Sequence, residues 1–246
     1  MEYKRFLFQG DSITDAARGR TEDPNHVMGH SYAFSVASRL MADFPRLGLE
    51  FFNRGVGGDS HVEMEKRWKT DTLELKPDVL SVLIGTNGAR QACGLYAEWD
   101  KGHPEGPDPL QTPESFESAL RRMLTAAREQ NPELLIVLCI PFRYDSPRRS
   151  PEEVRQVIRM VELRAEILRR LATEFDAVTP DFKRALDDAI ALNGDRPYWC
   201  WDGVHVTVAG HEILAREWLR AVKPRIGFLK DYPVTAGVTS STLRRK

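Results

Sequence analysis

The chain has 246 residues, enough to bury the core of one domain near the upper end of the usual size range. Its 35 Lys and Arg are balanced by 36 Asp and Glu, so the sequence gives no reason to expect nucleic acid or an anionic membrane surface as a partner. Three scattered cysteines form neither a disulfide framework nor a Cys-x-x-Cys pair, and no run reaches the roughly 20 apolar residues of a membrane span.

Short apolar runs alternate with longer amphipathic ones along the chain. Several short runs are continuously apolar, as in strands of a parallel sheet that is covered on both faces. The predicted strands are Lys4–Gln9, Leu49–Asn53, Val79–Ile84, Leu134–Cys139 and a short Ala177–Thr179. The predicted helices are Ser31–Asp43, Ser60–Trp68, Pro113–Gln130, Pro151–Glu174, Asp181–Leu192 and Val208–Ala221. This alternation predicts an α/β fold, a three-layer α/β/α sandwich with a five-stranded parallel sheet.

The two ends of the chain carry separate expectations. Residues 1–223 are predicted to form one domain, and residues 224–246 a tail that mixes apolar side chains with a basic end. The tail could pack on its own domain or reach a neighbouring subunit in a homo-oligomer. The first strand follows Met1 almost at once, without the apolar stretch and cleavage site of a secretory signal, which predicts a cytoplasmic protein.

The first predicted strand ends in Gly10-Asp11-Ser12. In isolation this tripeptide is a common turn sequence. Here the serine follows directly after a strand, so its hydroxyl and amide should face a cleft at the carboxyl edge of the sheet, where open α/β sheets bind ligands.

A second segment near the end of the chain supplies Asp202 and His205, three residues apart, before the last predicted helix. A serine hydroxyl is a weak nucleophile until an imidazole takes its proton, and a carboxylate fixes the tautomer of that imidazole and stabilises its charged form. Ser12, His205 and Asp202 could fill these roles in that order, with His205 returning the proton to the leaving alcohol.

Two further segments offer hydrogen-bond donors for the charge that develops on a substrate carbonyl oxygen. The glycines at 57 and 58 follow the second predicted strand, and Asn87 follows the third. Paired glycines by default permit a tight turn, and the same turn would let a backbone N–H approach a ligand closely. The side-chain amide of Asn87 and the N–H of Ser12 are the other candidate donors.

Together these four blocks resemble the SGNH (GDSL-type) serine hydrolases over most of the chain. The resemblance implies a flavodoxin-like SGNH hydrolase fold, Ser12, Asp202 and His205 as catalytic residues, and an oxyanion hole made by Ser12, Gly58 and Asn87. Within the family, the blocks look most like bacterial acetylxylan-esterase-type carbohydrate deacetylases. The chain departs from the family pattern at Gly88, where an Asp is usual, so the hydrogen bonds of that Asp must be absent or replaced.

Other candidate site residues have competing interpretations. Asp11 and Asp15 are expected to anchor the turn and cap the following helix, although Asp11 could also contact substrate. Trp99, in a long loop rich in Gly and Pro beside Asn87, and Trp201 could bind a sugar, but packing is the favoured role for Trp201. The histidines have no common spacing that suggests a metal site, and there is no phosphate-binding glycine motif, so no cofactor is expected.

The sequence therefore predicts a serine esterase that removes short acyl groups, above all acetyl, from carbohydrates such as xylo-oligosaccharides. A lysophospholipase or thioesterase is the alternative within the family, although the loop after Asn87 is more polar than an acyl channel or lid would be. A non-catalytic module that uses the cleft to hold a glycan is the alternative outside enzymes. Retention of Ser12, Asp202 and His205 argues against it, and Gly88 argues for it.

Overall fold

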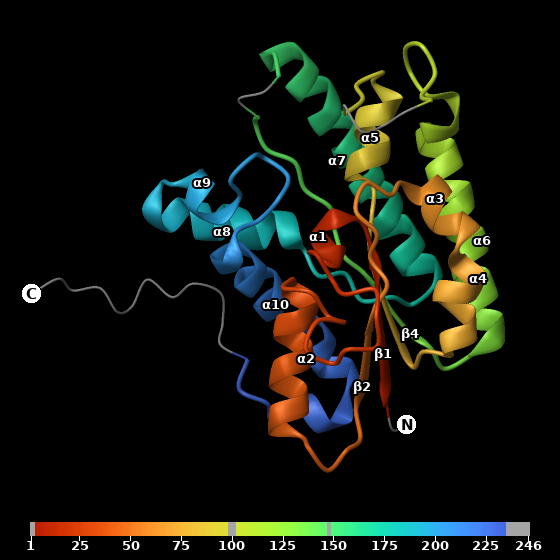
Figure 1. The fold of residues 1–246 in the computed structure, drawn as a ribbon, viewed down its shortest axis with the longest axis vertical. Helices are drawn as coiled ribbons and strands as arrows, with labels where there is room; N and C mark the ends of the chain where they lie inside the picture. The colour runs from red at the N-terminus through yellow and green to blue at the C-terminus, as the bar shows by residue number, and fades with distance from the viewer. Residues whose placement is uncertain (1–2, 98–101, 147–148, 235–246) are drawn as a thin grey trace, which may run out of the picture.

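The computed structural model describes residues 3–97, 102–146 and 149–234 (Figure 1). Its centre is a sheet of four parallel strands in the order β2-β1-β3-β4. The strands are β1 (Arg5–Gly10), β2 (Glu50–Asn53), β3 (Val79–Leu83) and β4 (Leu135–Leu138). All four run in the same direction, so the segments that follow them meet at one edge of the sheet.

The predicted fifth strand is wrong. The segment Ala177–Thr179 lies beside β4, but Val178 forms only one isolated bridge, to Val137. A turn at Asp176, with φ of +48°, leaves three residues before Pro180, which has no N–H to donate to a ladder. The next residue, Asp181, already caps a helix. This stretch is therefore too short to extend the sheet as a regular strand.

One face of the sheet is covered by four helices. Alternate strand residues such as Phe6, Phe8 and Val137 point into this cluster, where the fully buried Trp218 lies with its ring centre 5.4 Å from that of Phe8. The helices on this side are α2 (Tyr32–Asp43), α8 (Phe182–Asn193), α9 (Arg196–Trp199) and α10 (Val208–Val222) (Figure 1).

The opposite face has its own apolar cluster. Leu7, Leu80 and Ile136, which alternate with the residues of the first face, pack against a second set of helices. These are α3 (His61–Lys66), α4 (Trp68–Asp71), α6 (Pro113–Gln130) and α7 (Pro151–Glu174) (Figure 1). The three-layer α/β/α arrangement that the sequence predicts is therefore confirmed.

The long helices begin where their capping residues predict. The Thr112 hydroxyl accepts the Ser115 N–H at 3.1 Å at the start of α6, and Ser150 forms a capping box at the start of α7. The helix expected over Ser60–Trp68 is divided at Arg67 into α3 and α4. The helix expected after Asp11 is the single turn α1 (Ser12–Asp15). Short elements that were not predicted are α5 (Thr86–Ala92), α9 and the 3₁₀ turns η1 (Leu73–Leu75), η2 (Pro109–Gln111), η3 (Lys223–Arg225) and η4 (Gly227–Leu229).

The first part of the C-terminal segment packs on its own domain. Ile226 and Leu229 are buried in the same cluster as α2 and α10, and the ring of Phe228 lies 5.0 Å from that of Phe44. The Tyr232 hydroxyl donates to Asp43 Oδ2 at 2.5 Å. Residues 235–246, the remainder of the expected tail, lie outside the described residues.

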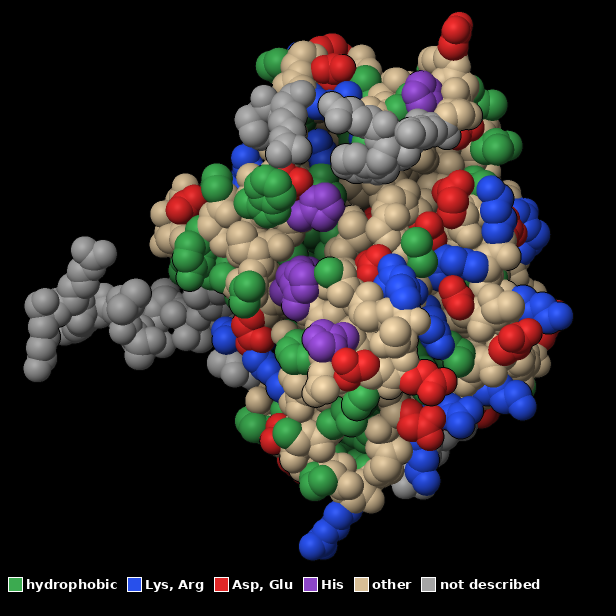
Figure 2. Space-filling view, in the orientation of Figure 1, with side chains coloured by type: hydrophobic (Ala, Val, Ile, Leu, Met, Phe, Trp, Pro, Cys, Tyr) green, Lys and Arg blue, Asp and Glu red, His purple; other side chains and the backbone are tan. Residues whose placement is uncertain are grey.

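Acidic and basic side chains are interspersed over the face of the molecule drawn in Figure 2, in line with the balanced composition. No helix among the described residues has both the length and the apolar character needed to cross a bilayer.

Candidate active site

Ser12 lies at the carboxyl edge of the sheet, as the first residue of α1. The chain leaves β1 at Gly10, and the Asp11 carboxylate caps α1 by accepting the Ile13 N–H at 3.0 Å. Ile13, Thr14 and Asp15 all donate their N–H groups to Asp11, whereas the Ser12 N–H has no acceptor among the described residues.

The structure brings Ser12, His205 and Asp202 together as one hydrogen-bonded chain. Ser12 Oγ lies 2.9 Å from His205 Nε2, and His205 Nδ1 lies 2.8 Å from Asp202 Oδ2. The other carboxylate oxygen of Asp202 accepts the backbone N–H groups of Val204 at 2.9 Å and His205 at 2.7 Å. The carboxylate is thus fixed on its own turn and orients the imidazole toward the serine.

The electrostatics of this pair suit His205 to accept a proton. The hydrogen bond to Asp202 raises the pKa of His205, against the lowering effect of burial. Burial alone would raise the pKa of Asp202, but its hydrogen bonds from the His205 ring and from two backbone N–H groups outweigh burial and lower it to about 2. Asp202 is therefore ionised wherever His205 titrates.

The turn that carries Asp202 and His205 is held by a close approach of two loops. Gly203 has φ of +89°, and a Cβ at this position would lie 2.3 Å from the Asp145 carbonyl oxygen. The Gly203 carbonyl accepts the Tyr144 N–H at 2.9 Å. Only glycine fits this approach, so the loop after β4 and the turn at Asp202 are locked together.

Gly58 and Asn87 lie on two segments that contact each other. Asn87, the second residue of α5, donates from Nδ2 to the Asp59 carbonyl at 3.1 Å. The Gly57 N–H donates to Asp15 Oδ2 at 2.8 Å, whereas the Gly58 N–H has no acceptor among the described residues. Of the two adjacent glycines, Gly58 is the one whose N–H remains available to a ligand.

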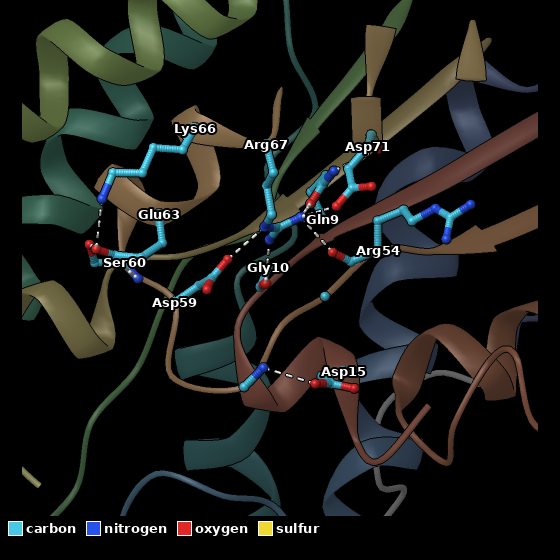
Figure 3. Close-up of polar contacts among 12 residues, drawn as sticks. Gln9, Gly10, Asp15, Arg54, Asp59, Ser60, Glu63, Lys66, Arg67 and Asp71 are labelled. Atoms are coloured by element: carbon cyan, nitrogen blue, oxygen red, sulfur yellow. Dashed lines mark hydrogen bonds and ion pairs between the residues drawn. The ribbon is translucent and has the colours of Figure 1, made fainter. Parts of the chain in front are cut away.

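Arg67, a residue that the sequence reasoning missed, holds this glycine loop against the end of β1 (Figure 3). Its Nε donates to Asp59 Oδ2 at 2.7 Å, and its Nη1 donates to Gln9 Oε1 and to the Arg54 carbonyl, both at 2.7 Å. Its Nη2 reaches the Gly10 carbonyl at 3.3 Å. One guanidinium therefore ties the loop before Ser60 to the strand that leads to Ser12.

The space beside Gly88 is filled from another part of the chain. A Cβ on Gly88 would lie 2.3 Å from Gln111 Oε1 and 3.4 Å from Arg164 Nη2. Gln111 Nε2 donates to Ser60 Oγ at 2.7 Å, and the backbone carbonyl of Gln111 accepts from Arg164 Nη2 at 2.5 Å. Gln111 and the buried Arg164 thus occupy the region into which a larger residue 88 would project, and they supply polar contacts there.

A cavity of about 430 Å³ opens beside His205, and Asn87, Asp202 and Arg143 are among its lining residues. A second hollow of about 690 Å³ lies along Gly57 and Gly58. Tyr96, from the long loop after α5, lines both. One hollow therefore borders His205 and the other borders Gly58, and polar and apolar groups contribute about equally to the walls of both.

The remaining predicted contact residues have different surroundings. Asp11 is only 2% exposed and caps α1, and burial raises its pKa to about 6. The favoured packing role for Trp201 is wrong, because its side chain is 51% exposed next to the turn of Asp202, whereas the neighbouring Trp199 is buried. Trp99 lies outside the described residues. Substrate contacts by Asp11 and Trp201 stay predictions.

The structure also tests whether any group of side chains could hold a metal. No three His, Cys, Asp or Glu side chains within residues 3–97, 102–146 and 149–234 gather as metal ligands would.

Known proteins resemble this chain in sequence and in fold. The model of the GDSL-like lipase/acylhydrolase family matches residues 8–213. An acetylxylan esterase of Geobacillus stearothermophilus is 28% identical over 222 residues, which make up 89% of this chain and 94% of that protein. A crystal structure of an acetylxylan esterase from that organism has a TM-score of 0.74 at 27% identity, over 90% of this chain and 96% of that one. A GDSL-like protein from Parabacteroides merdae has a TM-score of 0.77 at 30% identity, over 89% and 95% of the two chains. The chain therefore belongs to the GDSL-like lipase/acylhydrolase family and is a carboxylic ester hydrolase.

Proposed function

We propose that the protein is a serine esterase that removes acetyl groups from carbohydrates such as xylo-oligosaccharides, with Ser12, His205 and Asp202 as its catalytic residues. The observation that carries the proposal is the unbroken hydrogen-bonded chain from Ser12 Oγ through the His205 ring to Asp202. The acetylxylan esterase of Geobacillus stearothermophilus supports these roles, because its described catalytic mutants replace a serine and an aspartate by alanine.

In this proposal Ser12 Oγ attacks the ester carbonyl while His205 Nε2 takes the hydroxyl proton. The tetrahedral intermediate collapses when His205 gives that proton to the leaving alcohol, which leaves the acetyl group on Ser12. Water then attacks the acyl-enzyme, again with His205 as the base, and acetate leaves. Asp202 stays ionised throughout and stabilises the imidazolium.

The carbonyl oxygen becomes negatively charged in both steps and needs donors aimed at it. The Gly58 N–H, the Asn87 side chain and the Ser12 N–H are the groups that we assign to this task. The support is that Gly58 N–H has no acceptor among the described residues, and that Asn87 and Arg67 both hold the loop of Gly58 through Asp59.

Two features favour a sugar ester with a short acyl group. Polar groups make up about half of the walls of the hollows beside His205 and Gly58, which suits a carbohydrate better than a long acyl chain. Trp201 presents an exposed ring next to the catalytic turn, where it could stack on a sugar.

The direct test uses p-nitrophenyl esters from acetate to decanoate, followed by acetate release from acetylated xylo-oligosaccharides. The proposal expects the highest kcat/KM for the acetyl ester and release of acetate from the oligosaccharides. A preference for long acyl chains would instead favour a lysophospholipase or thioesterase. Turnover of no ester, together with binding of a glycan, would favour a non-catalytic module.

A further inference from the structure

The cavity beside His205 is lined by three arginines, Arg90, Arg143 and Arg149. Among its described lining residues Asp202 is the one carboxylate, and that group is already hydrogen-bonded to His205. The wall of this cavity is therefore electropositive, although the protein as a whole has a formal net charge of −1.

Arg143 is the arginine in this wall that forms no hydrogen bond or ion pair with any described residue, although the Asp202 carboxylate attracts its charge from a longer distance. Its side chain is only 9% exposed, it makes no hydrogen bond or ion pair with any described residue, and its Nε is buried without an acceptor. By contrast, Arg149 Nη2 donates to the Tyr96 carbonyl at 3.1 Å, and Arg90 Nη1 donates to the Leu95 carbonyl at 2.8 Å. A guanidinium stays charged at neutral pH, and burying a cation without a partner is costly.

The position of Arg143 is fixed by contacts on both sides. The next residue, Tyr144, donates its N–H to the Gly203 carbonyl at 2.9 Å, in the turn between Asp202 and His205. The preceding carbonyl, of Phe142, accepts from Thr86 Oγ1 at 3.4 Å, at the start of α5. Arg143 is thus held between the turn of His205 and the helix of Asn87.

This location determines which part of a substrate Arg143 would meet. His205 must give its proton to the leaving alcohol, so the cavity next to His205 holds the alcohol part of the ester. A planar guanidinium pairs best with a carboxylate, through two parallel hydrogen bonds. We propose, on the basis of the function proposed above, that Arg143 binds a carboxylate on the alcohol part of the substrate, so that the preferred substrates are acylated sugars with a uronic acid group.

The test compares two sugars that differ in one group. Methyl glucuronoside and its carboxamide, each acetylated at the same hydroxyl, are offered to the wild-type protein, and acetate release is measured. We expect kcat/KM for the acid to exceed that for the amide by about tenfold or more, because one charge-assisted hydrogen bond contributes a factor of this size. Arg143→Gln should bring this ratio close to one, and Arg143→Lys should keep part of it. The exposed, Glu152-paired Arg155 supplies a matched control, Arg155→Gln, that should keep the wild-type ratio.

The outcomes separate this inference from the proposed function. A wild-type protein that cleaves p-nitrophenyl acetate but shows equal kcat/KM for acid and amide overturns the role of Arg143 alone. The role is also overturned if Arg143→Gln lowers both rates and leaves their ratio at the wild-type value. If no ester is cleaved, the proposed function fails, and calorimetric titration with glucuronate and glucuronamide decides on Arg143. Selective binding of glucuronate supports the inference, and equal binding or none overturns it. If Arg143→Gln does not fold, the ratio of kcat/KM for the acid to that for the amide in the wild-type protein decides on the inference instead.

Discussion

Arg67 Nε donates to Asp59 Oδ2 at 2.7 Å, and this ion pair joins the break between α3 and α4 to the loop that carries Gly58. The side chains are 16% and 9% exposed, so both charges are largely removed from water. Five groups accept hydrogen bonds from the guanidinium, namely the Asp59 and Asp71 carboxylates, the Gln9 side chain and the carbonyls of Arg54 and Gly10. The position of the candidate oxyanion donor therefore depends on a contact that links distant parts of the chain.

Arg67→Gln should lower both stability and activity. The change leaves the Asp59 carboxylate buried without its cation, which costs about 3 kcal/mol of the free energy of unfolding. The Gly58 loop loses its tie to β1, so kcat for p-nitrophenyl acetate should fall by about tenfold or more. Urea unfolding and initial rates measure the two effects. Arg122→Gln removes the more exposed ion pair with Glu65 and should cost no more than about 1 kcal/mol. Equal costs for the two variants would contradict this account of Arg67.

The pH dependence of kcat/KM should follow His205. Only the neutral imidazole can accept the Ser12 proton, so activity rises as pH increases through the pKa of His205, which Asp202 holds above its usual 6.5. Asp202→Asn should move this limb to lower pH and reduce kcat by about 10³–10⁴-fold, because the imidazolium loses its stabilising charge. The control is Asp188→Asn, on the exposed carboxylate that pairs with Arg184. An unchanged limb in Asp202→Asn would argue against His205 as the titrating base.

Asp11→Asn should reduce the loss of stability that the wild-type protein shows as pH rises. Burial raises the pKa of Asp11 from 3.8 to about 6, so the folded state holds this proton more tightly than the unfolded state. The stabilisation from Asp11 is therefore full below pH 3.8 and is lost as pH rises through 6. Between pH 5 and pH 8 the wild-type protein should lose about 1–2 kcal/mol from this source, estimated from the free-energy equivalent of a pKa shift, and Asp11→Asn should not.

The asparagine keeps an acceptor for the Ile13 N–H that the Asp11 carboxylate binds, so the cap of α1 survives the change. Unfolding in urea at both pH values measures the effect. If the variant and the wild-type protein lose the same stability between pH 5 and pH 8, the raised pKa is wrong.

Gly88→Ala should destabilise the protein, although alanine favours a helix over glycine by about 1 kcal/mol. The new Cβ would lie 2.3 Å from Gln111 Oε1, whose amide is held by Ser60. We expect a net loss of about 1–2 kcal/mol from this overpacking. Gln111→Ala removes the obstacle, so the two changes together should be less costly than their sum by about 1 kcal/mol. If Gly88→Ala instead stabilises the protein, the Gln111 side chain moves aside at little cost in free energy, which would contradict this account.

The sequence predicts those parts of the molecule that depend on residues close to one another in the sequence. Thr112 and Ser150 mark the starts of α6 and α7 because each caps the turn that immediately follows. The proximity of Ser12 to the Asp202–His205 turn follows from their positions at the carboxyl edge of a parallel sheet, together with the family resemblance. The prediction of a fifth strand is wrong because an apolar run alone does not reveal the turn at Asp176 or the effect of Pro180 on pairing.

Residues that act over long sequence distances escaped prediction for a physical reason. Arg67 contacts Gln9, 58 positions away, and Gln111 contacts Ser60, 51 positions away. Arg143 follows an apolar strand without a local partner that would signal its burial. The exposure of Trp201 was also missed, because an aromatic residue beside a turn fits a core as well as a surface.

The central claim, that Ser12 is a nucleophile activated by His205, is tested most directly by covalent labelling with a serine-directed fluorophosphonate. Mass spectrometry of the wild-type protein should locate one adduct on Ser12, and Ser12→Ala should lose both the adduct and the hydrolysis of p-nitrophenyl acetate. His205→Gln should label far more slowly, because the hydroxyl then has no base. Labelling elsewhere, or full esterase activity in Ser12→Ala, would contradict the account.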